Sequence, residues 1–366
     1  MIVKGYKSFR ELDLRLNPVN VLIGANGSGK SNFIELFKMF NRMMEEGLQL
    51  YVAQAGGADQ ILHYGRKTTE EIICQLWFLR DARQLANGYE CHLVPAEDRL
   101  LIAYETVYFH DRSSYPKPYQ PLLHSDLLEE SQLPRWARQH GRVAGYVFSA
   151  MRSWRLYHFH DTSTSAKVKQ LGDLSDNMFL RPDAANLAAY LYLLRKKYPQ
   201  HYRNIVETVR LAAPFFGDFV LRPHPLNPEK IRLEWQERGS DLLFGPNTFS
   251  DGTLRFVCLA TLFLQPTKHL PSIIILDEPE LGLHPYAITL LAEMIHSVSE
   301  HTQVILATQS VTLVNQFTPD EILVVDREEG VSTIRQLSSA EIAHWLDEYG
   351  LGDLWEKNVL GGRPVR

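Results

Sequence analysis

The feature that most constrains this chain is the run Gly24-Ala-Asn-Gly-Ser-Gly-Lys-Ser31, which fits the pattern GxxxxGK[ST]. A short, nearly all-apolar segment, 19–23, precedes it and suits a buried strand. After it, apolar residues recur at helical spacing: Phe33, Leu36, Phe37, Phe40, Met43 and Met44. Glycines let the backbone wrap an anion, so that successive N–H groups and the helix N-terminus face it. The strand–loop–helix order therefore predicts a phosphate-binding loop.

This loop predicts ATP with Mg²⁺ as its ligands. The Lys30 side chain can reach the β- and γ-phosphates, and the Ser31 hydroxyl can bind Mg²⁺. The predicted nucleotide-binding residues of the loop are Asn26, Gly27, Ser28, Gly29, Lys30 and Ser31.

A second signal is the apolar run Ile273–Leu276, which is followed directly by Asp277 and Glu278. A buried strand that ends in two carboxylates can offer one, Asp277, to Mg²⁺ and the other, Glu278, to an attacking water. Many strands end in acidic residues, so the pattern is informative only together with the phosphate loop.

A third signal is Ser250-Asp-Gly-Thr253, which opens a segment with helical periodicity. Ser250, Asp251 and Gly252 at a helix N-terminus could form another anion site, and they also fit an ordinary N-cap.

The order of elements predicts an α/β fold with three regions. Strand and helix patterns alternate in the last third, which indicates a parallel sheet. Segments rich in β-branched and aromatic residues between 72 and 110 predict antiparallel strands. Four prolines suggest a surface excursion over 111–135, and a helix is expected over 183–198, ended by Pro199. The predicted regions are an N-terminal lobe (1–110), a mixed helical insertion lobe (111–240) and a C-terminal lobe (241–366).

The net charge of −5 excludes a protein that coats nucleic acid by bulk charge. Residues 135–210, however, carry 13 Lys and Arg against 5 Asp and Glu, with aromatic residues interleaved. This composition suits contact with DNA phosphates. It fits equally a solvated face or a surface for a protein partner.

Other residue counts narrow the class of protein. The three cysteines make no CxxC pair, so a disulfide framework or thiolate zinc site is not expected. No apolar run is long enough to span a membrane, and the first residues do not resemble a secretion signal. We therefore expect a cytoplasmic protein without membrane contact.

Taken in order, these motifs and Thr308-Gln-Ser310 resemble the ABC-type ATPase heads of the SMC/RecF class, and Lys7-Ser-Phe9 resembles their opening. Within that class the chain is similar to stand-alone bacterial RecF-like predicted ATPases of the AAA family, through the strings Tyr157–Thr162 and Leu354–Gly362. The resemblance implies a P-loop NTPase fold with a parallel core sheet, an antiparallel β subdomain and a helical insertion.

The resemblance also implies a mechanism. Two heads sandwich two ATP molecules, so a homodimer forms on ATP. Ser250, Asp251 and Gly252 of one subunit contact the γ-phosphate that Lys30 of the other holds. Glu278 is the catalytic base, and the loop Glu280–His284 crosses the interface.

Three further positions follow from the same resemblance. Lys7 and Ser8 join the nucleotide-binding set. Gln309 stands where a histidine is common, and it can hold water or phosphate by neutral hydrogen bonds. The glutamine that usually contacts Mg²⁺ from the lid loop is not identifiable, and His158–Asp161 is the span where it is expected; those histidines also fit a packing role.

Missing features shape the functional hypotheses. The lack of CxxC and heptads excludes zinc-hook repair ATPases and true SMC proteins, and the 56 residues after Ser310 are too few for a Toprim nuclease domain. One hypothesis is an ATP-hydrolysing switch that acts on DNA in repair or in defence against phage. The alternative is a nucleotide-gated module that controls a separate effector protein, a nuclease or toxin, without contacting DNA itself. The long insertion and Gln309 are poorly compatible with a third class, the membrane transporter subunit.

Overall fold

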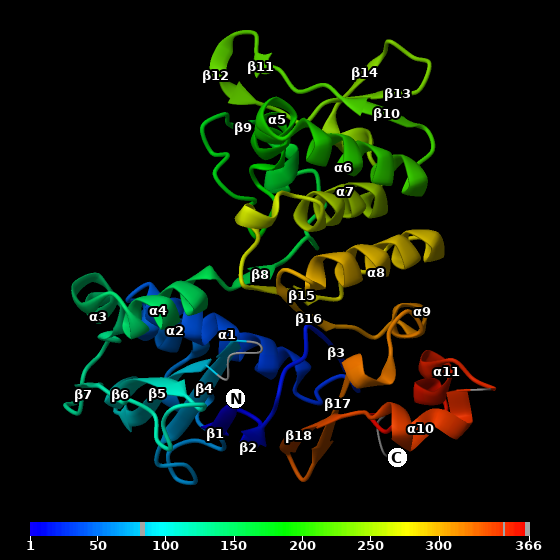
Figure 1. The fold of residues 1–366 in the computed structure, drawn as a ribbon. Coiled ribbons are helices and arrows are strands. Elements are labelled where there is room, and N and C mark those ends of the chain that lie inside the picture. The colour runs from blue at the N-terminus through cyan, green and yellow to red at the C-terminus, as the bar shows by residue number, and fades with distance from the viewer. Residues whose placement is uncertain (81–84, 347, 363–366) are drawn as a thin grey trace.

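The structure, a computed structural model, describes residues 1–80, 85–346 and 348–362. A six-stranded sheet lies at its centre, in the order β18-β17-β3-β16-β15-β8 (Figure 1). Five of its strands run parallel, and β18 joins the edge antiparallel to β17. The strands are β3 (Val19–Ile23), β8 (Arg155–Tyr157), β15 (Ile273–Asp277), β16 (Gln303–Ala307), β17 (Ile322–Glu328) and β18 (Val331–Gln336). The predicted parallel sheet is confirmed, and its central strands are apolar on both faces because both faces are covered.

A second six-stranded sheet, entirely antiparallel, has the order β2-β1-β4-β5-β6-β7. Its strands are β1 (Ile2–Tyr6), β2 (Phe9–Asp13), β4 (Ile72–Arg80), β5 (Leu85–Ala96), β6 (Arg99–Asp111) and β7 (Leu122–His124). The predicted antiparallel strands between 72 and 110 are therefore confirmed.

Helix α1 (Lys30–Met44) joins the two sheets, because one buried cluster contains its Phe33 and Phe40, Tyr89 of the antiparallel sheet and Ile275 of the parallel one. Short helices α2 (Leu48–Ala55) and η1 (Ala58–Gln60) follow it.

Two helices of the predicted insertion, α3 (Leu133–His140) and α4 (Val143–Ser153), lie beside α1 rather than in the upper lobe (Figure 1). Trp154, which follows α4, packs edge-on against Phe37 and Phe40 of α1, at centroid distances of 5.2 and 6.0 Å. The insertion therefore divides at Trp154, and only the chain after β8 enters the upper lobe.

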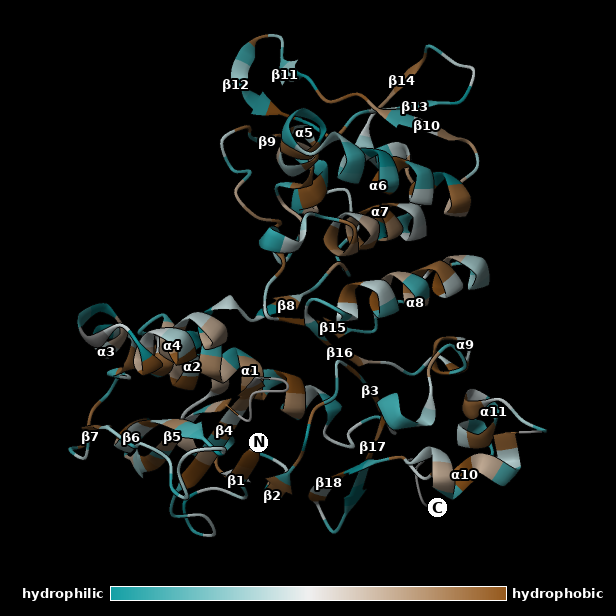
Figure 2. Cartoon of the chain, viewed as in Figure 1, coloured by the Kyte–Doolittle hydropathy of each residue, from teal (hydrophilic) through white to brown (hydrophobic). Residues whose placement is uncertain are grey.

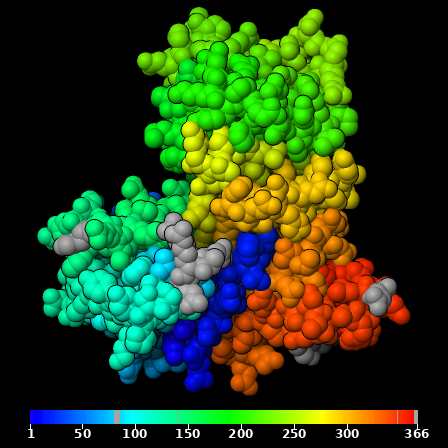
Figure 3. All heavy atoms as spheres, in the orientation of Figure 1, coloured from blue at the N-terminus to red at the C-terminus, as the bar shows by residue number. Residues whose placement is uncertain are grey.

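The upper lobe stands on one end of the central sheet (Figures 1 and 3). Its elements are η2 (Lys167–Lys169), β9 (Gly172–Asp173), α5 (Leu187–Lys197), α6 (Pro199–Ala212), β10 (Phe216–Phe219), β11 (Pro223–His224), β12 (Asn227–Ile231), β13 (Trp235–Glu237), β14 (Leu243–Phe244), η3 (Pro246–Thr248) and α7 (Asp251–Phe263). After η4 (Thr267–His269), helix α8 (Pro285–Ser299) lies between this lobe and the sheet. Brown, apolar stripes on these helices in Figure 2 correspond to the buried residues of α7 and α8.

The helix expected over 183–198 begins later, at Leu187. Ala184 has a left-handed φ of 53°, which breaks a helix at that point. The Asn186 side chain instead holds the preceding turn, since its Oδ1 accepts from Arg181 N at 2.9 Å and its Nδ2 donates to the Phe179 carbonyl at 2.8 Å. Pro199 ends α5 as expected and also begins α6, where its missing N–H costs nothing.

The C-terminal residues complete the sheet edge with α9 (Val311–Val314), η5 (Pro319–Glu321), α10 (Ser339–Leu346) and α11 (Leu351–Glu356). Near the C-terminal end of the described residues, Gly362 N donates to Asp326 Oδ1 on β17, at 2.7 Å. In the described part of the chain, no helix is both long and apolar enough to cross a membrane.

Candidate functional site

The predicted phosphate loop connects β3 to α1 and requires glycine at two positions. Gly24 and Gly29 have φ of 158° and 120°. A Cβ on Gly24 would overlap the Val325 carbonyl oxygen, and one on Gly29 would overlap the Ser332 hydroxyl. Helix α1 has no side-chain cap and no acidic residue in its first turn. Its first N–H groups are therefore available to an anion.

Lys30 lies folded over this loop. Its Nζ donates to the carbonyl oxygens of Gly24 at 2.6 Å and Ala25 at 3.0 Å, and the residue is buried. Burial lowers the pKa of Lys30, while the charges of Asp277 and Glu278 act in the opposite direction. Among the described residues, the Lys30 ammonium bonds to carbonyl oxygens and forms no ion pair. A phosphate oxygen can therefore replace these carbonyls without breaking an ion pair.

A cavity of about 420 Å³ brings most predicted residues together. It is lined by Asn26, Gly27, Gly29, Lys30, Ser31, Asn32, Asp277, Glu278, Gln309 and Arg327. The arrangement follows from topology, because β3, β15 and β16 are parallel neighbours and their carboxyl ends meet at one edge. Ser31 and Asp277 face the same space and could hold Mg²⁺, which prefers oxygen ligands and keeps several waters.

Asp277 and Glu278 form an acidic pair, and Gln309, called the switch residue from here on, holds one of them. Gln309 Nε2 donates to Glu278 Oε1 at 2.6 Å, and Glu278 has a left-handed φ of 43°, a strained conformation. Burial raises the pKa of Asp277, and the charge of Glu278 adds to this. A cation at this position would relieve both effects.

Two side chains of this region make contacts that no local sequence pattern indicates. Glu280 is buried, accepts a hydrogen bond from the Thr308 hydroxyl and has a pKa raised chiefly by burial. It therefore fixes the strand end that carries Gln309. Arg327 Nη1 donates to the Gly27 carbonyl at 3.1 Å. Neither contact has a sequence signal, because the partners are 28 and 300 residues apart.

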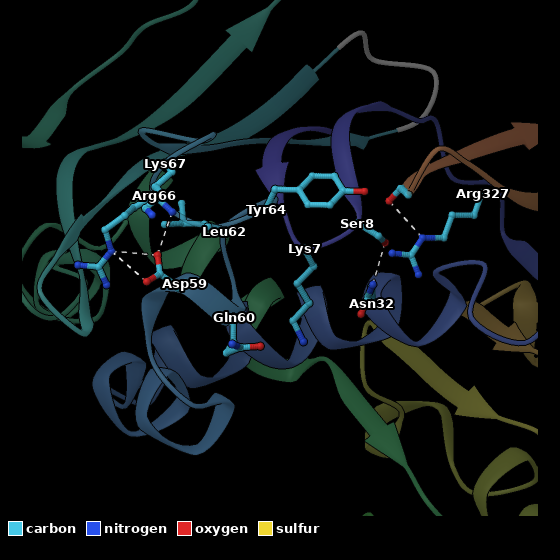
Figure 4. A pocket seen from close by; sticks show the side chains of 12 residues that line it. Lys7, Ser8, Asn32, Asp59, Gln60, Leu62, Tyr64, Arg66, Lys67 and Arg327 are labelled. Atoms are coloured by element: carbon cyan, nitrogen blue, oxygen red, sulfur yellow. Dashed lines mark hydrogen bonds and ion pairs between the residues drawn. The ribbon is translucent and has the colours of Figure 1, made fainter.

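A second cavity, of about 580 Å³, contains the predicted Lys7 and Ser8 and shares Asn32 and Arg327 with the first (Figure 4). Asn32 Nδ2 donates to Ser8 Oγ at 2.7 Å, and Lys7 pairs with Glu35. The Tyr64 ring projects along this cavity, with its hydroxyl donating to the Glu329 carbonyl at 3.1 Å. The two cavities therefore adjoin along the first turn of α1.

Ser250, Asp251 and Gly252, called the signature from here on, lie outside both cavities. Ser250 caps α7, because its Oγ accepts from Thr253 N at 3.1 Å, and Asp251 lies 3.9 Å from the Lys169 ammonium. A Cβ on Gly252 would overlap the Gly282 carbonyl oxygen, so the signature packs on the loop after Glu280. Ser250, Asp251 and Gly252 line neither cavity of their own subunit.

The span His158–Asp161 lies beside the acidic strand end, since Tyr157 of β8 pairs with Leu276 of β15 in parallel. Partial burial is the main cause that lowers the pKa of His158, and the charge of His160 lowers it further. The buried Arg255 of α7 donates to the carbonyls of Phe159 at 3.0 Å and His160 at 3.2 Å. Among the residues that the structure describes, no three His, Cys, Asp or Glu side chains form a metal-binding group, so these histidines do not form a metal centre with Asp277.

Solved structures with a similar fold include heads of Smc proteins. The chain resembles a head of Smc in a complex with the C-terminal winged-helix domain of ScpA, with 16% identity, a TM-score of 0.61 and coverage of 94% of this chain and 98% of that one. It is similarly close to Smc heads from Pyrococcus furiosus (16%, TM-score 0.58, 95% and 98%) and Pyrococcus yayanosii (15%, TM-score 0.54, 95% and 98%). No curated protein matches.

The fold is therefore that of an ABC/RecF-like head of the P-loop NTPase class. Residues 19–73 and 122–315, more than half of the chain, match the family described as "AAA domain, putative AbiEii toxin, Type IV TA system". The chain belongs to that family.

Proposed function

We propose that this chain binds Mg²⁺·ATP and hydrolyses it in an ATP-dependent homodimer. The observation that carries the proposal is the first cavity, where an uncapped helix N-terminus and Lys30 face Asp277 and Glu278 across the site. Such a site offers amides and an ammonium to the phosphates, and oxygen ligands to Mg²⁺. The nucleoside would occupy the adjoining second cavity, with Lys7, Ser8 and Tyr64 around it.

Hydrolysis needs a water aligned with the γ-phosphate. Glu278 would accept the proton of this water as its oxygen attacks phosphorus and the bond to the ADP oxygen breaks. Gln309 already donates to one Glu278 oxygen and leaves the other for the water. Mg²⁺, held through Ser31 and Asp277, would neutralise charge on the phosphates.

The position of Ser250, Asp251 and Gly252 supports the proposed dimer. Because these residues do not line the nucleotide cavity of their own subunit, a second copy would bring them to the γ-phosphate. Beside them, Leu281 on the loop that carries Gly282 and Tyr286 in the first turn of α8 are each 51% exposed. Exposed apolar side chains around a polar helix end are typical of a protein interface.

The decisive variant is Glu278→Gln. Turnover should fall about 10²- to 10⁴-fold, the usual contribution of a general base, while nucleotide binding persists. ATP should then hold the variant as dimers, measured by light scattering after size exclusion, and Lys30→Ala should stay monomeric under the same conditions. Unchanged turnover would remove Glu278 as the base. Monomeric protein with bound nucleotide would remove the shared site.

The biological role has two candidates. One is a switch on DNA, in repair or in defence against phage. The other is a nucleotide-gated module that controls an effector protein. The family description names a toxin and a toxin–antitoxin system, which agrees with this second candidate, whereas the exposed Arg135 and Arg152 of α3 and α4 agree with the first. The encoded neighbours can decide: an effector that co-purifies with wild-type protein and dissociates on Lys30→Ala supports the second candidate. Activity of the isolated protein on DNA contradicts it.

A further inference from the structure

The α3–α4 hairpin, residues 133–153, has an unusual charge composition. Its arginines are Arg135, Arg138, Arg142 and Arg152, and it contains no lysine. No Asp or Glu occurs anywhere from Ser131 to His160, although the whole chain has a net charge of −5. The hairpin therefore concentrates positive charge on one projecting feature at the side of the molecule (Figure 1).

Three of these arginines are exposed and available. Within the described residues, Arg135, Arg142 and Arg152 have no carboxylate partner. The acidic side chains of neighbouring elements are already occupied. Glu46 pairs with Arg138 at 3.0 Å, Glu45 with Arg42 at 2.8 Å, and Glu130 accepts from the N–H groups of Leu48 and Gln49.

The other basic residues of 135–210 differ in this respect. Arg195 and Arg210 donate to the carbonyls of Leu221 and Gly217, and Lys169 donates to the Thr162 carbonyl. These side chains hold the upper lobe together. Only Lys196, Lys197 and Arg203 remain exposed on α5 and α6 without a carboxylate partner among the described residues, which makes them a matched comparison.

Arginine is suited to phosphate, because its planar guanidinium forms two parallel hydrogen bonds to one anion. Arg142 is the N-cap residue of α4, and within the helix Tyr146, which is 40% exposed, precedes the exposed Ser149 by three positions on the same face. One exposed tyrosine does not make a stacking platform for single-stranded bases. We propose that this hairpin docks the phosphate backbone of duplex DNA, a refinement that rests on the DNA-switch form of the proposed function.

The hairpin is joined directly to the nucleotide site. Asn41 of α1 donates to the carbonyls of Arg152 and Trp154, so the end of α4 is fixed to the helix that begins at Lys30. Ser272, just before β15, donates its N–H to Ser153 Oγ at 3.1 Å, and β15 ends at Asp277. Movement of the hairpin on binding DNA would therefore be transmitted through α1 and β15 to both sides of the nucleotide cavity.

The test uses the full chain, Mg²⁺ and a non-hydrolysable ATP analogue, with fluorescence anisotropy of a duplex of about three helical turns between about 50 and 200 mM salt. The variant R135E/R142E/R152E should bind the duplex at least about 30-fold more weakly and reduce the salt slope by about 3, one for each lost phosphate contact. K196E/K197E/R203E should change affinity by less than about 3-fold, and R135K/R142K/R152K should retain binding because the charges remain.

Nucleotide binding, followed by calorimetry, should be unchanged in all three variants, so that failure of the DNA surface is separate from failure of the ATP site. Equal losses in the two charge-reversal variants, no loss in the hairpin variant, or no DNA binding by wild-type protein would each overturn the proposal. Tighter binding to duplex RNA than to duplex DNA would also overturn it, since A-form shape would then be what is recognised.

Discussion

Two helix N-termini of this molecule, those of α1 and α7, have similar sequences and different physical states. Both open with serine and glycine near the first turn. Helix α1 is uncapped, carries no acid and lies beside a buried lysine, whereas α7 is capped by Ser250 and carries Asp251. The first is ready for an anion in its own subunit. At the second, the Thr253 N–H is already bonded to Ser250 Oγ, and under the proposed function this helix end contacts a phosphate that another subunit holds.

The largest expected effect concerns the α1 side. Lys30→Ala should weaken binding of the ATP analogue about 10³-fold, about 4 kcal/mol, because a buried charge partner of the phosphates is lost. Isothermal calorimetry measures this directly. Lys38→Ala, an exposed lysine on the same helix, is the control and should bind normally. Equal binding by Lys30→Ala and wild type would contradict the assignment of the loop.

A smaller effect is expected on the α7 side. Ser250→Arg should reduce turnover about 100-fold, as loss of a positioned transition-state donor does, and leave nucleotide affinity of each subunit unchanged. Steady-state phosphate release and calorimetry separate the two quantities. Ser250→Ala removes the hydroxyl, and with it the cap worth about 1 kcal/mol of helix stability, but adds no bulk or charge at the interface, so it should keep part of the turnover. If Ser250→Arg lowers affinity as Lys30→Ala does, the two helix ends are not distinct in function.

The smallest effect concerns the switch residue between them. Gln309→Ala removes one exposed hydrogen bond from a neutral amide to the Glu278 carboxylate, which corresponds to about 3- to 10-fold in turnover. KM should stay constant because the contact is to the base and not to the phosphates. Gln309→His should restore turnover, since an imidazole can donate the same bond. A change in KM alone would place Gln309 in binding.

The span His158–Asp161, where the lid loop is expected, is contacted by helix α7. Arg255, one turn into α7, donates to the backbone of Phe159 and His160, which lie beside Asp277. Movement of the α7 end on dimer formation would therefore be transmitted to the acidic strand end. This contact joins residues 96 and 95 positions apart in the chain, and nothing in either local sequence indicates it.

The sequence by itself predicted the phosphate loop, the acidic strand end and a parallel sheet. Each of these depends on neighbours within a few residues, where chain connectivity fixes the spacing of glycine, lysine or carboxylate. Tertiary structure alone decided that Arg327 reaches Gly27, that Glu280 holds Thr308, and that the basic run 135–210 is divided between two parts of the molecule. These outcomes depend on which distant surfaces pack together, and that is set by burial of whole helix and sheet faces rather than by any short pattern.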